Sequence, residues 1–176
     1  MIEKLREKYA LSAWLIRIAF VVTYVFAFWY DTCGIVDYMS MIFVDFTASL
    51  WYVPLVAVVT GICMLGILMI MVSVIINFCR LYYLPKAEFT LIVTAFFVLR
   101  HLIMGVLKLL YYITPIIHIW GQLLIPLIAT LICAILFYKT VKKLYLNNLN
   151  EPHFFKCELI LFIVYFGVTS VATLVA

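Results

Sequence analysis

Four polar side chains in the second half of the chain have the types and spacing of an anion-binding site. Arg100 and Lys108 are eight residues apart with Met104 midway between them, so a helix would place all three on one face. His118 and Gln122 are four residues apart in the next apolar segment. Guanidinium and ammonium groups attract negative charge, while imidazole and amide groups add hydrogen bonds. The four residues therefore predict a basic ligand-binding site for an anionic solute or a lipid headgroup.

The segments that carry these residues are long and apolar. Hydrophobic residues make up 69% of the 176 residues, only 11% are charged, and the mean hydropathy is +1.24. A soluble domain of this size would need more polar surface. We therefore predict an all-α, polytopic integral membrane protein with five transmembrane helices plus an outer interfacial helix, all within a single transmembrane domain over 1–176. The predicted spans cover about 10–30, 50–79, 89–112, 116–138 and 157–176, and the interfacial helix covers about 31–49.

The Lys and Arg residues predict the orientation, because basic loops stay on the cytoplasmic side of a membrane. The N-terminal segment and the connections at 80–88 and 139–156 carry most of the cations, whereas the loops of the opposite side carry only Asp31, Asp37 and Asp45. This alternation predicts a protein integral to the plasma (cytoplasmic) membrane, with a cytoplasmic N-terminus and a C-terminus outside. The cations flank apolar segments instead of forming one binding face, so no nucleic-acid partner is expected.

Arg100 is predicted to lie deep within the membrane. Arg100 follows Glu88 by twelve residues, about 18 Å along a helix, which is near the middle of the bilayer. A cation at this depth is costly and usually faces the bundle interior with a partner. The predicted spans offer no acid there, and the aspartates of the segment 31–49 come within reach of Lys108 more readily than of Arg100. A tight turn near 114–115 brings Gln122 level with Lys108, so the predicted site opens to the outside.

A purely structural explanation stays open: Arg100 caps backbone carbonyls at a helix kink, and Lys108 extends toward the membrane surface. Catalysis is poorly supported, because the predicted spans place no acid beside His101 or His118 to orient it as a base. We assign no catalytic residue and regard an enzyme as the less expected class. The cysteines form no paired motif, so no metal site and no cofactor is predicted.

The leading interpretation is a multi-pass, transport-type membrane component with an outward-facing cationic pocket for an anionic solute or lipid headgroup. In this interpretation Arg100 neutralises the ligand's charge, Lys108 attracts the ligand at the mouth, and His118 and Gln122 donate or accept hydrogen bonds.

The first alternative is a non-catalytic accessory or scaffold subunit of a membrane complex. Small residues four apart, Ala57 with Gly61 and Ala129 with Cys133, allow helices to approach closely, within this chain or on another one. A membrane-embedded enzyme is the third alternative. The expected partners are accordingly the lipid bilayer, an anionic ligand or lipid headgroup, and a membrane protein.

Overall fold

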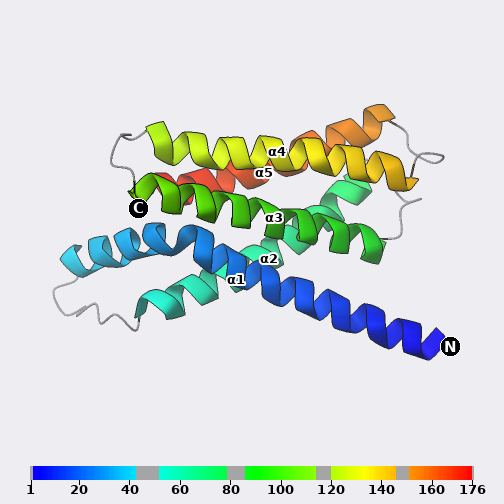
Figure 1. Cartoon of the computed structure of the whole chain (residues 1–176), viewed down its shortest axis with the longest axis horizontal. Coiled ribbons are helices and arrows are strands. Elements are labelled where there is room, and N and C mark those ends of the chain that lie inside the picture. The colour runs from blue at the N-terminus through cyan, green and yellow to red at the C-terminus, as the bar shows by residue number, and fades with distance from the viewer. Residues whose placement is uncertain (1, 43–51, 79–85, 114–119, 146–150, 176) are drawn as a thin grey trace.

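The computed structural model describes residues 2–42, 52–78, 86–113, 120–145 and 151–175, and all of them are helical. The five helices are α1 (Ile2–Ile42), α2 (Tyr52–Phe78), α3 (Lys86–Ile113), α4 (Trp120–Tyr145) and α5 (Glu151–Val175). Successive helices run in alternate directions along the long axis, which leaves the two termini at opposite ends (Figure 1). The prediction of an all-α protein is confirmed for the described residues.

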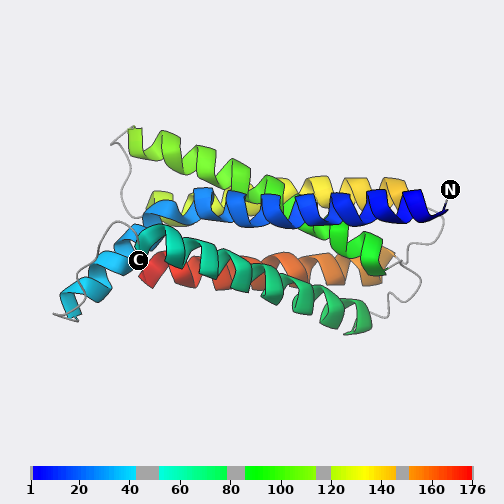
Figure 2. The ribbon, with the colours of Figure 1, turned by 90° about the horizontal axis from the view of Figure 1, so that it is seen from below.

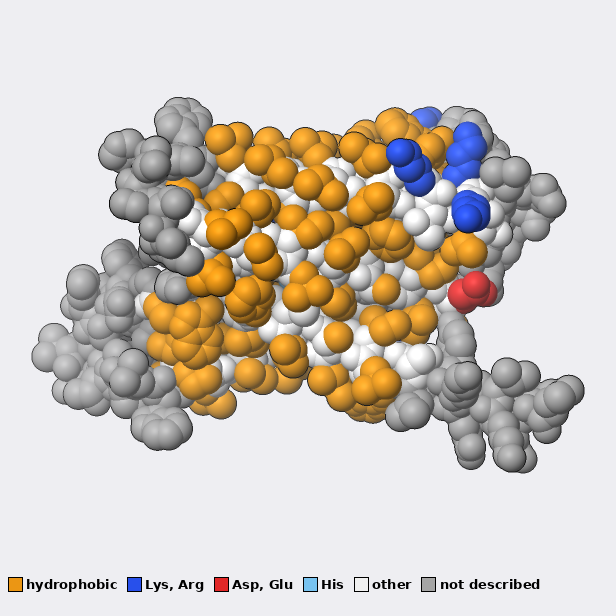
Figure 3. All heavy atoms as spheres, in the orientation of Figure 1, with side chains coloured by type: hydrophobic (Ala, Val, Ile, Leu, Met, Phe, Trp, Pro, Cys, Tyr) orange, Lys and Arg blue, Asp and Glu red, His pale blue; other side chains and the backbone are white. Residues whose placement is uncertain are grey.

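Four of these helices contain segments long and apolar enough to cross a membrane: Ser12–Trp29, Tyr52–Phe78, Lys86–Tyr111 and Leu124–Leu144. Their outward faces are apolar as well, with Trp14, Leu55 and Ile70 each about 60% exposed or more. On the face in Figure 3, hydrophobic side chains cover the middle and the described Lys and Arg side chains lie at one end. Such a surface is stable against the acyl chains of a lipid bilayer, whereas in water an exposed apolar surface of this extent would cause aggregation. The chain is a membrane protein.

Each helix also buries one face against its neighbours. In α2 the buried residues recur every three or four positions, from Val53 through Ala57, Gly61, Met64, Leu68 and Val72 to Ile76, which is the spacing of a single helical face. This face packs on α1, and α1 also packs along α3; α3 packs on α4 and α4 on α5 (Figure 2). A methyl group added at Gly61 would lie only 3.3 Å from side-chain atoms of Val21 and Tyr24, so α1 and α2 cross closely there.

The small-residue pairs predicted from the sequence lie inside the bundle. Ala57, Ala129 and Cys133 have no exposed surface, and Gly61 is buried. These positions therefore serve contacts between helices of this chain, and they leave the outer faces to larger apolar residues.

Helix α1 is longer than the first predicted span. The sequence predicts a span ending near Tyr30 and a separate interfacial helix over 31–49, but α1 continues through Ile42; residues 43–49 lie outside the described part. The hydroxyl of Thr32 donates to the carbonyl of Phe28 at 2.9 Å, a bond that is typical of Thr within a helix and that often bends it. The light-blue end of α1 turns away from the rest of the helix (Figure 2).

Candidate functional site

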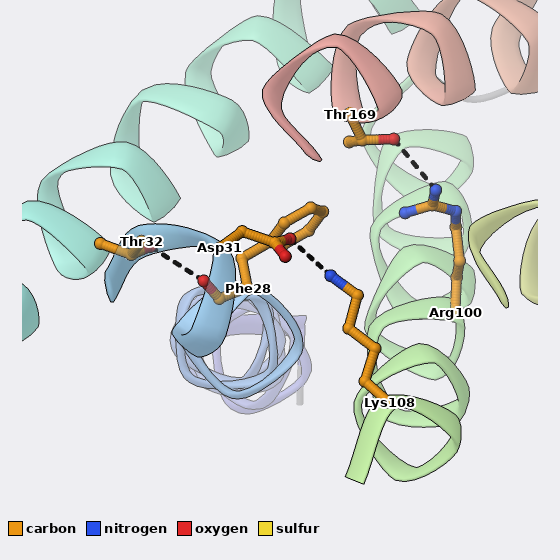
Figure 4. A network of polar contacts seen from close by, with 6 residues as sticks. All are labelled: Phe28, Asp31, Thr32, Arg100, Lys108 and Thr169. Carbon is orange, nitrogen blue, oxygen red and sulfur yellow. Dashed lines mark hydrogen bonds and ion pairs between the residues drawn. The ribbon is translucent and has the colours of Figure 1, made fainter. Parts of the chain in front are cut away.

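Arg100 lies in the middle of α3 with no exposed surface. Its guanidinium reaches toward α4, where Nε donates to Thr130 Oγ1 at 2.8 Å. It also reaches toward α5, where Nη2 donates to Thr169 Oγ1 at 3.1 Å, the contact that Figure 4 shows. The ring of Tyr165 lies 5.2 Å from the guanidinium carbon, within the range of a cation–π contact. The third nitrogen, Nη1, is buried and has no hydrogen-bond partner.

The hydroxyl groups of Thr130 and Thr169 accept hydrogen bonds from Arg100, and each donates its own proton to a backbone carbonyl of its helix. Thr130 Oγ1 donates to the carbonyl of Pro126 at 2.7 Å, and Thr169 Oγ1 donates to the carbonyl of Tyr165 at 2.9 Å. A hydroxyl has one proton and two lone pairs, so each threonine accepts from Arg100 while donating to its own helix. The guanidinium is thus held by neutral dipoles and by an aromatic ring.

Lys108 lies about two turns farther along α3 and faces α1. Its Nζ forms an ion pair with Asp31 Oδ2 at 2.5 Å and lies 5.0 Å from the centre of the Phe28 ring (Figure 4). Lys108 is 4% exposed and Asp31 is 7% exposed. Because α1 continues past Tyr30, it carries Asp31 into the bundle as the counter-ion of Lys108.

His101 follows Arg100 in the chain but faces α1. Its Nε2 and the Tyr165 hydroxyl share a hydrogen bond of 2.9 Å, and it is edge-on to Phe20 and Tyr24 at ring-centre distances of 4.9 and 5.4 Å. Tyr165 therefore joins the two residues, with its ring beside the guanidinium and its hydroxyl on the imidazole. The other imidazole nitrogen, Nδ1, is buried without a hydrogen-bond partner.

Arg100 has no ion-pair partner within the described residues. The other buried cation, Lys108, is neutralised by Asp31. The buried Glu158, which is 6% exposed, balances the number of buried charges in the described residues, but it precedes Tyr165 by seven residues and Thr169 by eleven on α5, about 10–16 Å along the helix, and so does not pair with Arg100. An uncompensated cation in a dry interior is strongly unfavourable, so the site favours the arrival of a negative charge.

Of the four residues predicted from the sequence, the structure describes the side chains of two. Arg100 and Lys108 are both buried on the α3 face that also carries Met104. His118 lies outside the described residues, and Gln122 belongs to α4 but its side chain is not described. The contribution of these two residues to the site stays a prediction.

The residues that hold the guanidinium do not stand out in the sequence. Thr130, Tyr165 and Thr169 are ordinary members of apolar segments, and nothing in their own helices marks them as partners of Arg100. One signal was present: Tyr165 and Thr169 are four residues apart, which gives α5 a short polar stripe.

Among the grooves on the surface of the described residues, two lie between helices of the bundle. One, of about 320 Å³, runs between α4 and α5 and is lined mostly by apolar side chains such as Leu131 and Phe162, together with Thr130, Lys139 and Glu158. The other, of about 400 Å³, lies between α1, α2 and α3 near Arg17 and Lys86. Arg100 lines neither groove, but Thr130 separates it from the first.

The arrangement as a whole is a buried cationic centre, suited to binding negative charge. Its selectivity depends on which donors remain free and on how much room the packed side chains leave. No protein-family model, no curated protein and no solved structure matches this chain, so its function is argued from this site.

Proposed function

We propose that the protein is a transport-type membrane component that binds an anionic solute at Arg100. The observation that carries the proposal is the state of the guanidinium, which is fully buried and which, among the described residues, is held by neutral groups and has no hydrogen-bond partner at Nη1. An anion at Nη1 would supply the missing negative charge and the missing acceptor together. The complete burial of Arg100 favours a solute over a lipid headgroup, because headgroups stay at the membrane surface.

The proposed topology has five membrane crossings in the plasma membrane. Helix α5, with 25 residues, is about 37 Å long, enough for a crossing beside the four segments already described. Lys86, Lys139, Lys143 and Lys156 are exposed, and their positions in the alternating helices put them at the same end as the N-terminus. The positive-inside rule makes that end cytoplasmic and the C-terminus external.

The proposed route for the solute begins at the external end. Lys108 lies about 12 Å from Arg100 toward that end, so an anion entering from outside meets Lys108 before Arg100. His118 and Gln122 belong to the proposed mouth. The solute would compete with Asp31 for Lys108 and then pass to the uncompensated guanidinium.

The experiment is anion exchange across proteoliposomes, with labelled chloride, phosphate and acetate tested separately. Arg100→Gln is compared with Arg17→Gln, which removes the same charge from an exposed position on α1. We expect exchange by the wild type, an exchange rate lower by about tenfold or more in Arg100→Gln because the anion loses its charged partner, and little change in Arg17→Gln. Exchange no faster than in empty liposomes, or equal rates for wild type and Arg100→Gln, would show that the proposal is wrong.

One observation favours the accessory or scaffold subunit as a second candidate. The groove between α4 and α5 is largely apolar, and Thr130, which accepts a hydrogen bond from Arg100, is one of the residues that line it. A partner helix in this groove, carrying an acid at the level of Thr130, would neutralise the guanidinium from the lipid side.

This second candidate predicts a partner in stoichiometric amount after gentle solubilisation. Leu131→Trp, in the groove wall, should reduce the amount of partner recovered, whereas Ile70→Trp on the exposed face of α2 should not. A protein that purifies alone and stays folded would exclude this candidate.

A further inference from the structure

We infer that the Arg100 site takes a monovalent inorganic anion of about halide size, chloride being the common example. The inference rests on the proposed function, because it assumes that an anion occupies the site, and it adds the chemical class of that anion. Three properties of the described residues support it: the number of uncompensated charges, the number of free donors and the enclosure of the site.

The charge balance favours a single negative charge. The Lys108–Asp31 pair is neutral, and among the described residues Arg100 is left without an ion-pair partner, since the buried Glu158 lies about 10–16 Å farther along the bundle. A monovalent anion would neutralise Arg100. Sulfate or doubly charged phosphate would leave an excess negative charge in the dry interior, which is as unfavourable as the excess positive charge that it replaces.

The free donors are few. Arg100 Nε and Nη2 already donate to Thr130 and Thr169, and those hydroxyls have used their protons on backbone carbonyls. The Tyr165 hydroxyl is engaged with His101. The N–H groups of Nη1 remain. Apart from the guanidinium, the Ser170 hydroxyl and His101 Nδ1 are also buried without a partner, and each offers at most one donor more.

This donor count discriminates between kinds of anion. Carboxylate, phosphate and sulfate have two to four oxygens, and proteins usually bind them with a two-pronged guanidinium contact and further donors. At Arg100 only one nitrogen is free, so most of those oxygens would be buried without partners. A halide is a single spherical acceptor and needs no fixed geometry, so the free N–H groups of Nη1 can satisfy it.

The enclosure of the site also favours a small ion. Arg100, Met104 and Tyr165 have no exposed surface, and Arg100 lines neither of the two grooves. An occupant must therefore fit by small movements of packed side chains, which interiors resist increasingly as the displaced volume grows. It must also shed its water, and a singly charged ion of halide size loses less hydration energy than a multiply charged one.

The test measures chloride binding by the purified full-length protein in detergent through the broadening of the ³⁵Cl NMR line. Bromide, acetate, phosphate and sulfate are added as competitors at matched ionic strength. We expect bromide to remove the broadening, and the other three anions to need at least roughly tenfold higher concentrations for the same effect. Thermal unfolding in the same salts should give the same order as an independent readout.

Three variants assign the effect to the site. Arg17→Gln should keep the broadening, Arg100→Gln should lose it, and Arg100→Lys, which keeps the charge but not the planar fork, should weaken chloride binding by roughly tenfold. If Arg100→Gln does not fold, Arg100→Lys and the wild-type competition series still decide the question.

The outcomes separate the inference from the proposed function. Acetate, phosphate or sulfate competing as well as bromide, in a manner that depends on Arg100, would overturn the inference and leave Arg100 as an anion site. No Arg100-dependent effect of any anion would overturn both.

Discussion

At the scale of single residues, two cations on one face of α3 are accommodated by different means. Lys108 is a compact charge and is paired with a carboxylate, whereas Arg100 spreads its charge over a planar group that neutral hydroxyls and a ring can hold. The position of both cations could be predicted from their depth in an apolar segment. The aspartates of 31–49 could be predicted to lie within reach of Lys108, and Asp31 is the one that pairs with it. Thr130 and Thr169 could not be predicted as partners of Arg100, because they come from two other helices and only packing brings them together.

Removing one member of the Lys108–Asp31 pair should cost more than removing both. Asp31→Asn leaves a buried ammonium without its counter-ion, so we expect a loss of about 3–5 kcal/mol in the free energy of unfolding, and the double variant Asp31→Leu/Lys108→Met should recover most of it. Reversible unfolding in mixed micelles measures the difference. Lys86→Met, at the exposed start of α3, is the control, and a double variant less stable than Asp31→Asn would contradict the pairing.

Tyr165 should show two separable roles. Tyr165→Phe keeps the ring beside Arg100 but leaves His101 Nε2 without its partner, so we expect a loss of about 1–3 kcal/mol in stability with chloride affinity little changed. Tyr165→Leu removes the ring as well and should weaken chloride binding further. Unfolding and ³⁵Cl line broadening on the same samples distinguish the roles, and equal chloride affinity in Tyr165→Leu and wild type would rule out a contribution from the ring.

At the scale of the helices, hydropathy predicts that helices form but is a poor guide to where they end. Trp29 and Tyr30 resemble an interfacial belt, which is why the first predicted span ends there, yet helix formation depends on the backbone and α1 continues to Ile42. Helix α4 likewise extends to Tyr145 and carries Lys139, which the sequence places in a connecting loop. These boundaries have a consequence for the site, since the continuation of α1 is what brings Asp31 to Lys108.

The contact between α1 and α3 should depend on a glycine. A methyl group at Gly105 would lie 2.4 Å from ring atoms of Phe26, whereas one at Gly66 on α2 would meet nothing within 4 Å. We therefore expect Gly105→Ala to lose about 1–3 kcal/mol in stability through overpacking, while Gly66→Ala stays neutral or gains up to about 1 kcal/mol from helix propensity. Thermal unfolding of the two variants side by side checks this, and equal midpoints would mean that Phe26 turns outward at no cost.

At the scale of the whole molecule, the uneven distribution of basic residues between the two ends of the bundle predicts how the protein is oriented in the membrane. The exposed cations Lys86, Lys139, Lys143 and Lys156 come from the adjoining ends of α3, α4 and α5, while Asp31 and Lys108 lie toward the opposite end. The proposed solute therefore enters from the side with fewer basic residues and meets its first cation below the surface. A reversed orientation would open the same site to the cytoplasm. The orientation in the membrane therefore decides whether the site binds anions from outside the cell or from the cytoplasm.

The orientation can be tested with reporter fusions in a bacterial host. Alkaline phosphatase is active only outside the cytoplasmic membrane. Green fluorescent protein that is exported unfolded does not become fluorescent, so its fluorescence reports a cytoplasmic location. A fusion after Ala176 should therefore give phosphatase activity without fluorescence. A fusion after Leu144, at the basic end of α4, should give the reverse because the cations hold that end inside. Five crossings require the two fusions to report opposite sides; the same side for both would mean that α5 does not cross. Opposite sides in the reverse sense would instead place the Lys108 end of the site in the cytoplasm, and the anion would then have to enter from within the cell.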